Sequence, residues 1–351
     1  MGGTSVVELD DVHGIKMLDT SDVLGTVQHF GDQLRHEILC EPLFRPTDEI
    51  LNIVYVGMGG SALAALLIRT WPTVRVPFEV IRDYNVPPYI GAKTLVIVSS
   101  YSGNTEETLT ALGEAEFHGA QIAVIASGGK LAELARERGY SLAILPKVIQ
   151  PRFVVGYNLR ALLGILQSAG LFMDDFGDLS RAADFLDEVA KELAPTEPTS
   201  RNPAKQLAEK CVRKSVVIYA GRVLAPAAYK WKIGFNENAK QIAWCGQLPE
   251  ANHNEIVGWL RHPEHNPYVV IDLHSSFEHP RIRTRFRVSE ELLSETRPTS
   301  FLVEAQGINP LEHVLWTSLV GDFVTTYTAI LSGENPAPID IIEDFKKAMN
   351  A

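Results

Sequence analysis

A glycine-rich segment, GMGGS at residues 57–61, stands directly after an apolar run and directly before a helix-like stretch. Gly59 and Gly60 let the backbone turn tightly, and the first N–H groups of the helix beginning near Ser61 face any anion that lies there. The segment therefore predicts an anion-binding turn. Taken alone, it also fits the G-x-G-x-x-G/A fingerprint of dinucleotide-binding proteins, with Asp83 as the ribose-binding acid, or a tight turn without a ligand.

A second polar segment, SYSGNT at residues 100–105, also follows an apolar run and precedes a helix-like stretch. The hydroxyl groups of Ser100, Ser102 and Thr105 can surround the oxygens of one phosphate monoester with uncharged donors. A dinucleotide needs no such ring of hydroxyls, so the two segments together favour a phosphate monoester. The alternative is that Thr105 is an ordinary helix N-cap and the serines form a polar turn.

Candidates for proton transfer lie in the second half of the chain. Glu237 stands between two asparagines in a helical run at residues 229–240, and His253 also stands between two asparagines. A carboxylate and an imidazole are the usual general bases and acids of enzymes. Taken singly, however, Glu237 would be read as an exposed helical acid.

The histidines that follow His253 raise the question of a metal site. His262, His265 and Glu255 lie close by in the sequence, and together they superficially resemble a metal-binding cluster. Their spacing does not place the three histidines on one helical face, and the surrounding segment is loop-like. We therefore expect no metal, and we expect His262 and His265 to be surface residues.

Length, composition and charge limit the class of protein. With 351 residues the chain has room for two domains, and 46% hydrophobic and 21% charged residues are typical of a soluble globular protein. The net charge of −11 argues against a general nucleic-acid binder or a protein held on anionic lipid. Cys40, Cys211 and Cys245 have no C-x-x-C spacing, and the acidic N-terminus shows no secretory signal, so we expect a cytoplasmic protein.

The elements that must position these residues alternate between strands and helices. Expected strands cover residues 52–56, 77–81, 94–99, 121–125 and 141–145, with helices at 61–70, 105–118 and 130–138 between them. This pattern is typical of a doubly wound α/β domain with a parallel sheet. Further strands are expected at residues 215–219, 268–273 and 301–304, and the weakly charged stretch at 154–173 is expected to be a buried helix rather than a membrane span.

The domain limits follow from changes in composition. We expect a helical arm at residues 1–40 that packs on the first domain, a first domain at 41–175, and a second domain at 195–351. The acidic, proline-containing segment at 174–202 is expected to be a helix followed by an exposed linker.

Several ordered motifs across both halves resemble one known family. GMGGSA, RDYNVP and SSYSGNTEET occur in that order, followed by Gln150-Pro151-Arg152, by residues 236–240 and 252–255, and by Phe345-Lys346 near the end. They resemble the sugar isomerase (SIS) domain, and within that superfamily the bifunctional phosphoglucose/phosphomannose isomerases. The resemblance implies an α/β fold of two SIS-type doubly wound domains with parallel sheets flanked by helices.

The resemblance also implies roles for individual residues. Gly59, Gly60, Ser61, Ser100, Ser102 and Thr105 would bind the substrate phosphate. Glu237 would be the base, His253 would assist ring opening, and Arg152 would neutralise the enediolate rather than form an ion pair between the domains. Lys346 would reach the sugar oxygens, with Phe345 as its buried neighbour, although a shift of one residue would give that role to Lys347.

The implied activity is the interconversion of glucose 6-phosphate and mannose 6-phosphate with fructose 6-phosphate, without metal or organic cofactor, in a homodimer that shares its histidines between subunits. The alternatives are a non-catalytic phosphosugar-binding regulator, an isomerase of another sugar phosphate, and a nicotinamide-dependent dehydrogenase. Ser99 stands where relatives more often have asparagine, and residues 62–68 lack a Gly-Asp step that relatives often have. Both departures leave the proposed phosphate donors in place.

Overall fold

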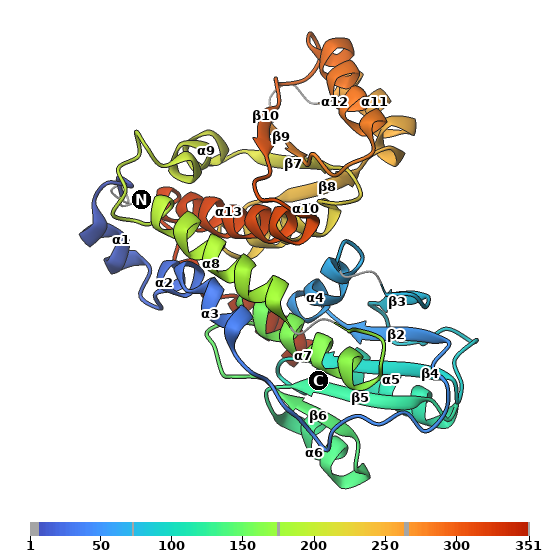
Figure 1. Cartoon of the computed structure of the whole chain (residues 1–351). Coiled ribbons are helices and arrows are strands. Elements are labelled where there is room, and N and C mark those ends of the chain that lie inside the picture. Colours follow the sequence, from blue (N-terminus) through green and yellow to red (C-terminus); the bar gives the residue numbers. More distant parts are fainter. Residues whose placement is uncertain (1–6, 72–73, 174–175, 263–266, 350–351) are drawn as a thin grey trace. The chain divides into compact units, whose positions relative to one another are not determined.

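The computed structural model describes residues 7–71, 74–173, 176–262 and 267–349 (Figure 1). The chain divides into two compact units. We call His29–Phe185 the first unit, and we call Met1–Gln28 together with Leu186–Ala351 the second unit. Each unit is built around its own β-sheet, so each is described by itself.

The first unit contains a sheet in the order β1-β6-β5-β4-β2-β3, in which β1 is antiparallel to β6 and the other pairs are parallel. Every strand expected in this half is present, whereas the short β1 was not predicted. The strands are β1 (Cys40–Glu41), β2 (Asn52–Gly57), β3 (Phe78–Ile81), β4 (Thr94–Ser100), β5 (Gln121–Ala126) and β6 (Ser141–Ile144). The central strands β2, β4 and β5 are almost wholly buried, as expected for a parallel sheet covered on both faces.

The order of the strands fixes where a ligand can bind in this unit. The chain runs from β2 to β3 on one side and then returns to β4 on the other side of β2. Ligands of open α/β sheets bind outside the carboxyl ends of the strands at such a reversal. The glycine-rich segment at residues 57–61 follows β2, and the serine-rich segment at residues 100–105 follows β4 (Figure 1).

The helices of the first unit are α3 (Phe30–Arg35), α4 (Gly60–Ile68), α5 (Glu106–Phe117), α6 (Gly129–Arg138), η1 (Pro151–Phe153) and α7 (Val155–Ser168). Helix α8 (Gly177–Glu192) begins in the first unit and ends in the second.

The second unit contains a fully parallel sheet in the order β10-β9-β7-β8. Its strands are β7 (Ser215–Ala220), β8 (Ala243–Gln247), β9 (Tyr268–His274) and β10 (Phe301–Glu304), of which β8 was not predicted. The helices are α1 (Val12–Leu18), α2 (Val23–Gln28), α9 (Pro203–Cys211), α10 (Ala225–Glu237), η2 (Glu250–His253), α11 (Glu255–Gly258), η3 (Trp259–Arg261), α12 (Pro280–Leu293), α13 (Pro310–Leu331) and α14 (Asp340–Met349). The α/β fold with parallel sheets and flanking helices is therefore confirmed in both units.

Helix α13 is the central helix of the second unit. Its 22 residues are long and apolar enough to cross a membrane, but 94% of its most apolar window is buried inside the fold. It packs against α2, α9 and α10. This environment is that of a core helix, so burial in protein accounts for its apolar composition.

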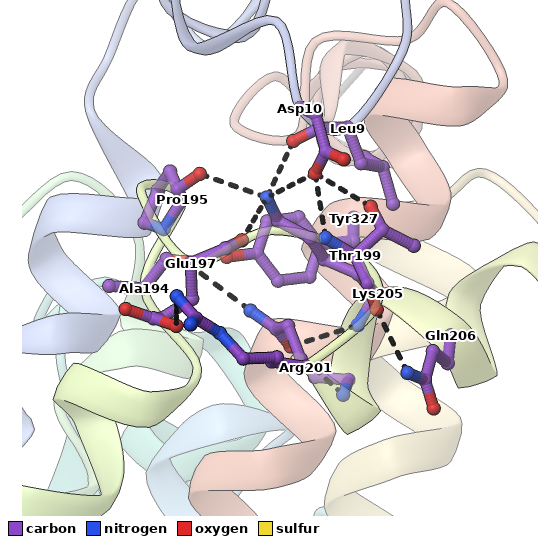
Figure 2. A network of polar contacts seen from close by, with 12 residues as sticks. Leu9, Asp10, Ala194, Pro195, Glu197, Thr199, Arg201, Lys205, Gln206 and Tyr327 are labelled. Carbon is purple, nitrogen blue, oxygen red and sulfur yellow. Dashed lines mark hydrogen bonds and ion pairs between the residues drawn. The ribbon is translucent and has the colours of Figure 1, made fainter.

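A buried lysine joins three segments of the second unit, as Figure 2 shows. The Nζ of Lys205 donates to the backbone oxygens of Leu9 (2.6 Å), Pro195 (2.9 Å) and Glu197 (2.7 Å) and lies 3.3 Å from Asp10 Oδ1. The Lys205 side chain is 0% exposed, and desolvation lowers the pKa of its ammonium group. The carbonyl oxygens replace the water that burial removes.

This arrangement corrects two expectations from the sequence. Of the expected arm at residues 1–40, Met1–Gln28 groups with the second unit, so the expected packing on the first domain is wrong for that part and holds for residues 29–40. The segment at residues 194–203 is mostly buried or half-buried, so the expected exposed linker is also wrong. The physical reason is shared: both segments supply backbone oxygens to Lys205, and Thr199 also donates two hydrogen bonds to Asp10.

Candidate active site

The glycine turn connects β2 to α4 in the first unit. Gly59 occupies the N-cap position of α4 with φ +50°, and the helix begins at Gly60. The first turn of α4 carries no acidic side chain, so the positive end of the helix dipole is not neutralised there. The buried Tyr55 hydroxyl donates to the backbone oxygen of Ser61 (2.8 Å) and holds the start of the helix against β2.

Gly60 allows η1 to lie directly against the start of α4. A Cβ at this position would lie 2.8 Å from the backbone oxygen of Pro151 and 2.9 Å from the backbone nitrogen of Arg152, which is too close for any other residue. The first unit therefore brings Arg152 beside the glycine turn. Arg152 is 3% exposed, and its guanidinium lies 4.8 Å from the centre of the Phe153 ring.

The hydroxyl groups of the two segments meet at the reversal between β2 and β4. Ser61 Oγ accepts a hydrogen bond from the backbone N–H of Tyr101 (3.1 Å), and Ser100 Oγ bonds to Thr105 Oγ1 (2.8 Å). Ser102 is exposed, and its Oγ accepts from the N–H of the residue two places further on (3.3 Å). We call Gly59, Gly60, Ser61, Ser100, Ser102 and Thr105 the cradle.

The alternative, in which Thr105 is an N-cap and the serines form a polar turn, agrees with part of the geometry, because Ser100 Oγ also accepts from the Gly103 N–H (3.1 Å). Thr105 does occupy the N-cap position of α5. Among the described residues its hydroxyl bonds to Ser100 Oγ and makes no side-chain capping hydrogen bond to the helix. The hydroxyl is therefore turned toward the other cradle residues, where neutral donors can meet an oxyanion.

Sequence reasoning missed the residues that support the cradle. Tyr55 positions Ser61, and the Tyr101 hydroxyl bonds to the backbone oxygen (3.2 Å) and N–H (2.5 Å) of Val148 in the loop that leads to Arg152. Burial raises the pKa of Tyr55, so its hydroxyl stays protonated and can donate. The available signal was a tyrosine within an otherwise aliphatic strand, since a buried tyrosine needs a partner for its hydroxyl.

Glu237 is the last residue of α10 in the second unit and is half-buried. Both of its neighbours are anchored. Asn236 Oδ1 accepts from the N–H of Ala243 in β8 (3.1 Å), and Asn238 Nδ2 donates to Thr325 Oγ1 in α13 (3.0 Å). Sequence reasoning noted these asparagines without seeing that they hold the backbone on either side of the carboxylate.

His253 is exposed at the end of η2 in the same unit, and its surroundings are also anchored. Asn252 Nδ2 donates to Ser289 Oγ (2.9 Å), and Glu255 Oε2 accepts from the Tyr219 hydroxyl (2.9 Å). The imidazole is thus presented from a backbone that is tied to α12 on one side and to β7 on the other.

A cavity of about 20 Å³ lies behind η2, between Tyr219, Asn252 and Asp272, and it has room for about one water molecule. Arg297 also lines it, with NH2 3.9 Å from Asp272 Oδ2. Among the described residues, Asp272 Oδ1 and Arg297 Nε have no hydrogen-bond partner. Desolvation raises the pKa of Asp272 to about 6, so this acid binds its proton more tightly than usual.

The remaining candidates show two departures from expectation. Lys346 and Lys347 are both exposed on α14 and pair with Glu343 (2.7 Å) and Asp344 (3.1 Å). Phe345 is 64% exposed, so the expectation of a buried neighbour for Lys346 is wrong. The described residues of α14 include no buried side chain: Ile341, Phe345 and Met349 are exposed and Ile342 is half-buried.

His262 also differs from its prediction as a surface residue. It is half-buried, its Nε2 bonds to the backbone oxygen of Thr296 (2.6 Å), and its ring packs edge-on against Trp259 and Tyr268. His265 lies outside the described residues. Within the described part of the chain, no group of three His, Cys, Asp or Glu side chains is placed to hold a metal ion.

Comparison with known proteins adds to this geometry. Residues 200–349 match the family model of the bacterial phospho-glucose isomerase C-terminal SIS domain. A bifunctional phosphoglucose/phosphomannose isomerase from Caldicellulosiruptor bescii is 33% identical over 307 residues, which cover 86% of this chain and 90% of the relative. The chain belongs to the bifunctional phosphoglucose/phosphomannose isomerase family. The resemblance drawn from the motifs is therefore confirmed.

This member of the isomerase family is also similar to a curated epimerase and to a solved structure. A D-glucosamine-6-phosphate 4-epimerase from Sulfolobus acidocaldarius is 37% identical over 206 residues, covering 58% of this chain and 63% of the relative. The crystal structure of a glucose-6-phosphate isomerase like protein from Thermus thermophilus has a TM-score of 0.62 at 19% identity and covers 96% of this chain and 99% of its own. The latter shows that the two proteins share a fold over nearly the whole of this chain.

Proposed function

We propose that this chain is an aldose–ketose isomerase that interconverts glucose 6-phosphate and mannose 6-phosphate with fructose 6-phosphate. The observation that carries the proposal is the cradle: Ser61, Ser100 and Thr105 gather at the reversal between β2 and β4, beside the N-terminus of α4. Bifunctional relatives over most of the chain support the choice of substrates.

The cradle would hold the phosphate of the sugar. The backbone N–H groups at the start of α4 and the cradle hydroxyls supply donors, and the helix dipole favours a negative charge. Such a site suits a chain with a net charge of −11, because it attracts an anion locally rather than through the overall field.

Glu237 would act as the base that carries a proton between C1 and C2 of the open-chain sugar. Removing the C2 proton of the aldose leaves an enediolate with its charge on O1; a proton then passes from O2 to O1, and returning the first proton to C1 gives the ketose. The anchored asparagines on both sides restrict where the carboxylate can lie, which favours a fixed distance to the two carbons. His253 would assist ring opening by moving a proton at the ring oxygen.

Two cations would stabilise the charge that develops on the enediolate. Arg152 is buried beside the cradle, and a fixed guanidinium close to the bound sugar is suited to an oxyanion. Lys346 would reach the sugar oxygens, with Lys347 as the alternative. Proton transfer of this kind requires no metal or organic cofactor.

We further propose a cytoplasmic homodimer in which His253 serves the site of the neighbouring subunit, as the family resemblance implies. Residues 41–175 and 195–351 would be its two SIS domains. The reaction would belong to glycolysis and gluconeogenesis.

A coupled assay that follows fructose 6-phosphate formed from each aldose tests the mechanism. Glu237→Gln should lose at least about 100-fold in kcat, because the amide cannot accept the proton. Glu209→Gln, at an exposed position on α9, is the matched control and should retain full activity. Normal turnover in the Glu237→Gln protein would reject the assigned base.

The wild-type protein distinguishes the alternative functions. If the wild type binds fructose 6-phosphate tightly but does not turn it over, a regulator is favoured. If the wild type binds a nicotinamide cofactor, a dehydrogenase is favoured. The similarity to the 4-epimerase makes glucosamine 6-phosphate the first alternative substrate to assay. Turnover of glucosamine 6-phosphate together with inactivity on both hexose 6-phosphates would replace the proposed isomerisation.

A further inference from the structure

Tyr101 lies between Ser100 and Ser102 of the cradle, but its hydroxyl contacts a different loop of the first unit. The hydroxyl accepts a hydrogen bond from the Val148 N–H (2.5 Å) and lies within donating distance of two backbone oxygens, those of Val148 (3.2 Å) and Pro146 (3.4 Å). Both residues belong to the loop that connects β6 to η1, and Arg152 is the second residue of η1. One side chain therefore joins the cradle segment to the loop that leads to the buried arginine.

The backbone of Tyr101 is fixed on both sides. Its N–H donates to Ser61 Oγ at the start of α4 (3.1 Å). Its carbonyl oxygen accepts from the N–H (3.0 Å) and the hydroxyl (2.6 Å) of Ser127, which directly follows β5. The Tyr101 ring therefore reaches the β6–η1 loop from a point that is held between α4 and the end of β5.

The bond between Tyr101 and Ser61 leaves the Ser61 hydroxyl able to bind phosphate. A serine hydroxyl has one donor and two acceptor positions, and the Tyr101 N–H occupies one acceptor position. The Ser61 O–H can therefore still donate to a phosphate oxygen. Because linked hydrogen bonds polarise one another, a phosphate that receives this proton would strengthen the hold of Ser61 on the Tyr101 peptide.

The chain on the other side of Arg152 is held by a residue that takes no part in the cradle. Gln33 of α3 is 4% exposed, its Nε2 donates to the backbone oxygen of Phe153 (2.7 Å), and its Oε1 accepts from the Gly156 N–H (3.2 Å). A Cβ on Gly156 would lie 2.6 Å from Gln33 Cβ, so the two segments pack closely. Arg152 thus lies between a contact to α3 and a contact to the cradle segment.

We propose that Tyr101 is a positioning residue that couples phosphate binding in the cradle to the placement of Arg152. The inference rests on the proposed function, in which Ser61 binds the phosphate and Arg152 stabilises the enediolate. The path runs from the phosphate to Ser61 Oγ, from there to the Tyr101 peptide, and from the Tyr101 hydroxyl to the loop before Arg152. Binding at the non-reacting phosphate therefore orders a charge at the reacting end of the sugar.

Amide hydrogen exchange of the full chain, with inorganic phosphate as the probe, tests the coupling without relying on isomerase activity. In the wild type, phosphate should slow exchange at least about threefold in residues 57–61 and in residues 146–153. Tyr101→Phe keeps the backbone bond to Ser61 but loses the hydroxyl, so phosphate should slow only residues 57–61. Tyr140→Phe, which loses a hydroxyl bond to Glu116 (3.1 Å) in the same unit, is the matched control and should respond as the wild type does.

Three results of the exchange measurement would overturn the proposal. Equal slowing of residues 146–153 in the wild type and in Tyr101→Phe would show that the hydroxyl carries no coupling. Loss of the slowing in Tyr140→Phe as well would indicate general loosening of the unit. If phosphate slows neither segment of the wild type, the cradle does not bind phosphate, and the proposed function fails together with the coupling.

Steady-state kinetics with glucose 6-phosphate test whether Tyr101 acts through Arg152. Tyr101→Phe should lower kcat about tenfold and leave the inhibition constant of inorganic phosphate within about twofold. In an Arg152→Ala background the same substitution should lower kcat by less than about twofold, because the arginine that it positions is gone. Fully additive losses would overturn the proposal. Normal kcat in Arg152→Ala alone would count against the proposed function, and the exchange measurement would then decide the coupling by itself.

Discussion

The two units place the same kind of loop pair at the same point of their sheets and fill it differently. In the first unit the side chains that meet there are hydroxyls, and Ser100 and Thr105 bond to each other. In the second unit the side chain is the Glu278 carboxylate, bonded to the backbone N–H of Val223. The two sheets therefore have the same reversal of strand order, and the side chains that lie there differ in charge.

The difference extends to the buried charges of the second unit. Lys205 is enclosed by three backbone oxygens, and Glu278 accepts a hydrogen bond from the backbone N–H of Val223. These charges meet their partners within the fold and hold distant segments together. The first unit instead offers neutral donors whose partners can change when an anion arrives.

The largest effect is expected where a charge is most completely enclosed. Lys205→Met should lower the free energy of unfolding by about 3 to 6 kcal/mol, because three buried or part-buried backbone oxygens lose their donor. Urea unfolding measures this, with the exposed Lys191→Met as control, for which a change within about 0.5 kcal/mol is expected. Equal stability of the two variants would show that the enclosure of Lys205 contributes nothing.

Asp272 is an exception among the buried charges of the second unit, because one of its carboxylate oxygens has no hydrogen-bond partner among the described residues. Its pKa is raised to about 6, so between about pH 4 and pH 6 the folded state keeps a proton that the unfolded state has lost. This group therefore costs stability as pH rises through that window, by about 3 kcal/mol at most.

Asp272→Asn removes this dependence on pH. Unfolding free energies measured in urea from pH 4 to pH 7 should show the variant gaining on the wild type up to about pH 6, with a constant difference above it. Parallel curves across the whole range would mean that Asp272 keeps an ordinary pKa in the fold.

Gly60→Ala tests how tightly the cradle is built. The added methyl group would meet the backbone of Pro151 and Arg152, so we expect a loss of about 2 kcal/mol in stability and a rise in KM. Gly113→Ala is the control, because an added Cβ meets nothing within 4 Å at that exposed helical position. It should raise stability by up to about 1 kcal/mol. The packing around the two glycines requires that the two substitutions change the free energy of unfolding in opposite directions.

The smallest effect separates one serine of the first unit from one serine of the second unit. Ser61→Ala should raise KM for the sugar phosphate about tenfold and cost about 1 kcal/mol of stability, since the Tyr101 N–H loses its acceptor. Ser275→Ala should also cost stability, but it should leave KM unchanged, because Ser275 serves the loop that Glu278 fills. A comparable rise in KM in both variants would erase the distinction between the two loop pairs.

Much of the fold could be predicted from local patterns. The β-branched runs of the first unit predicted β2 to β6 within a residue or so of their ends, because a buried parallel strand is a continuous apolar run. β8 was missed because its sequence, AWCGQ, has no such run. β1 was missed because it contains only two residues.

Contacts between residues that lie far apart in the sequence could not be predicted from local patterns. Leu9 and Lys205 lie 196 residues apart, and Val223 and Glu278 lie 55 residues apart, so no spacing rule could join them. The grouping of the cradle residues could be predicted from the sequence, because they lie at the ends of two strands, β2 and β4, that pair directly in the sheet. The burial of Phe345 was predicted wrongly, since it was inferred from the family resemblance and not from any contact that the sequence indicates.

The burial of α13 has a consequence for synthesis on the ribosome. It is apolar enough to resemble a membrane span, and α2, α9 and α10, which cover it, all precede it in the chain. When residues 310–331 emerge, the surfaces that shield them from solvent have therefore already been made. This long apolar segment can therefore be covered as soon as it emerges, which favours orderly completion of the fold during translation.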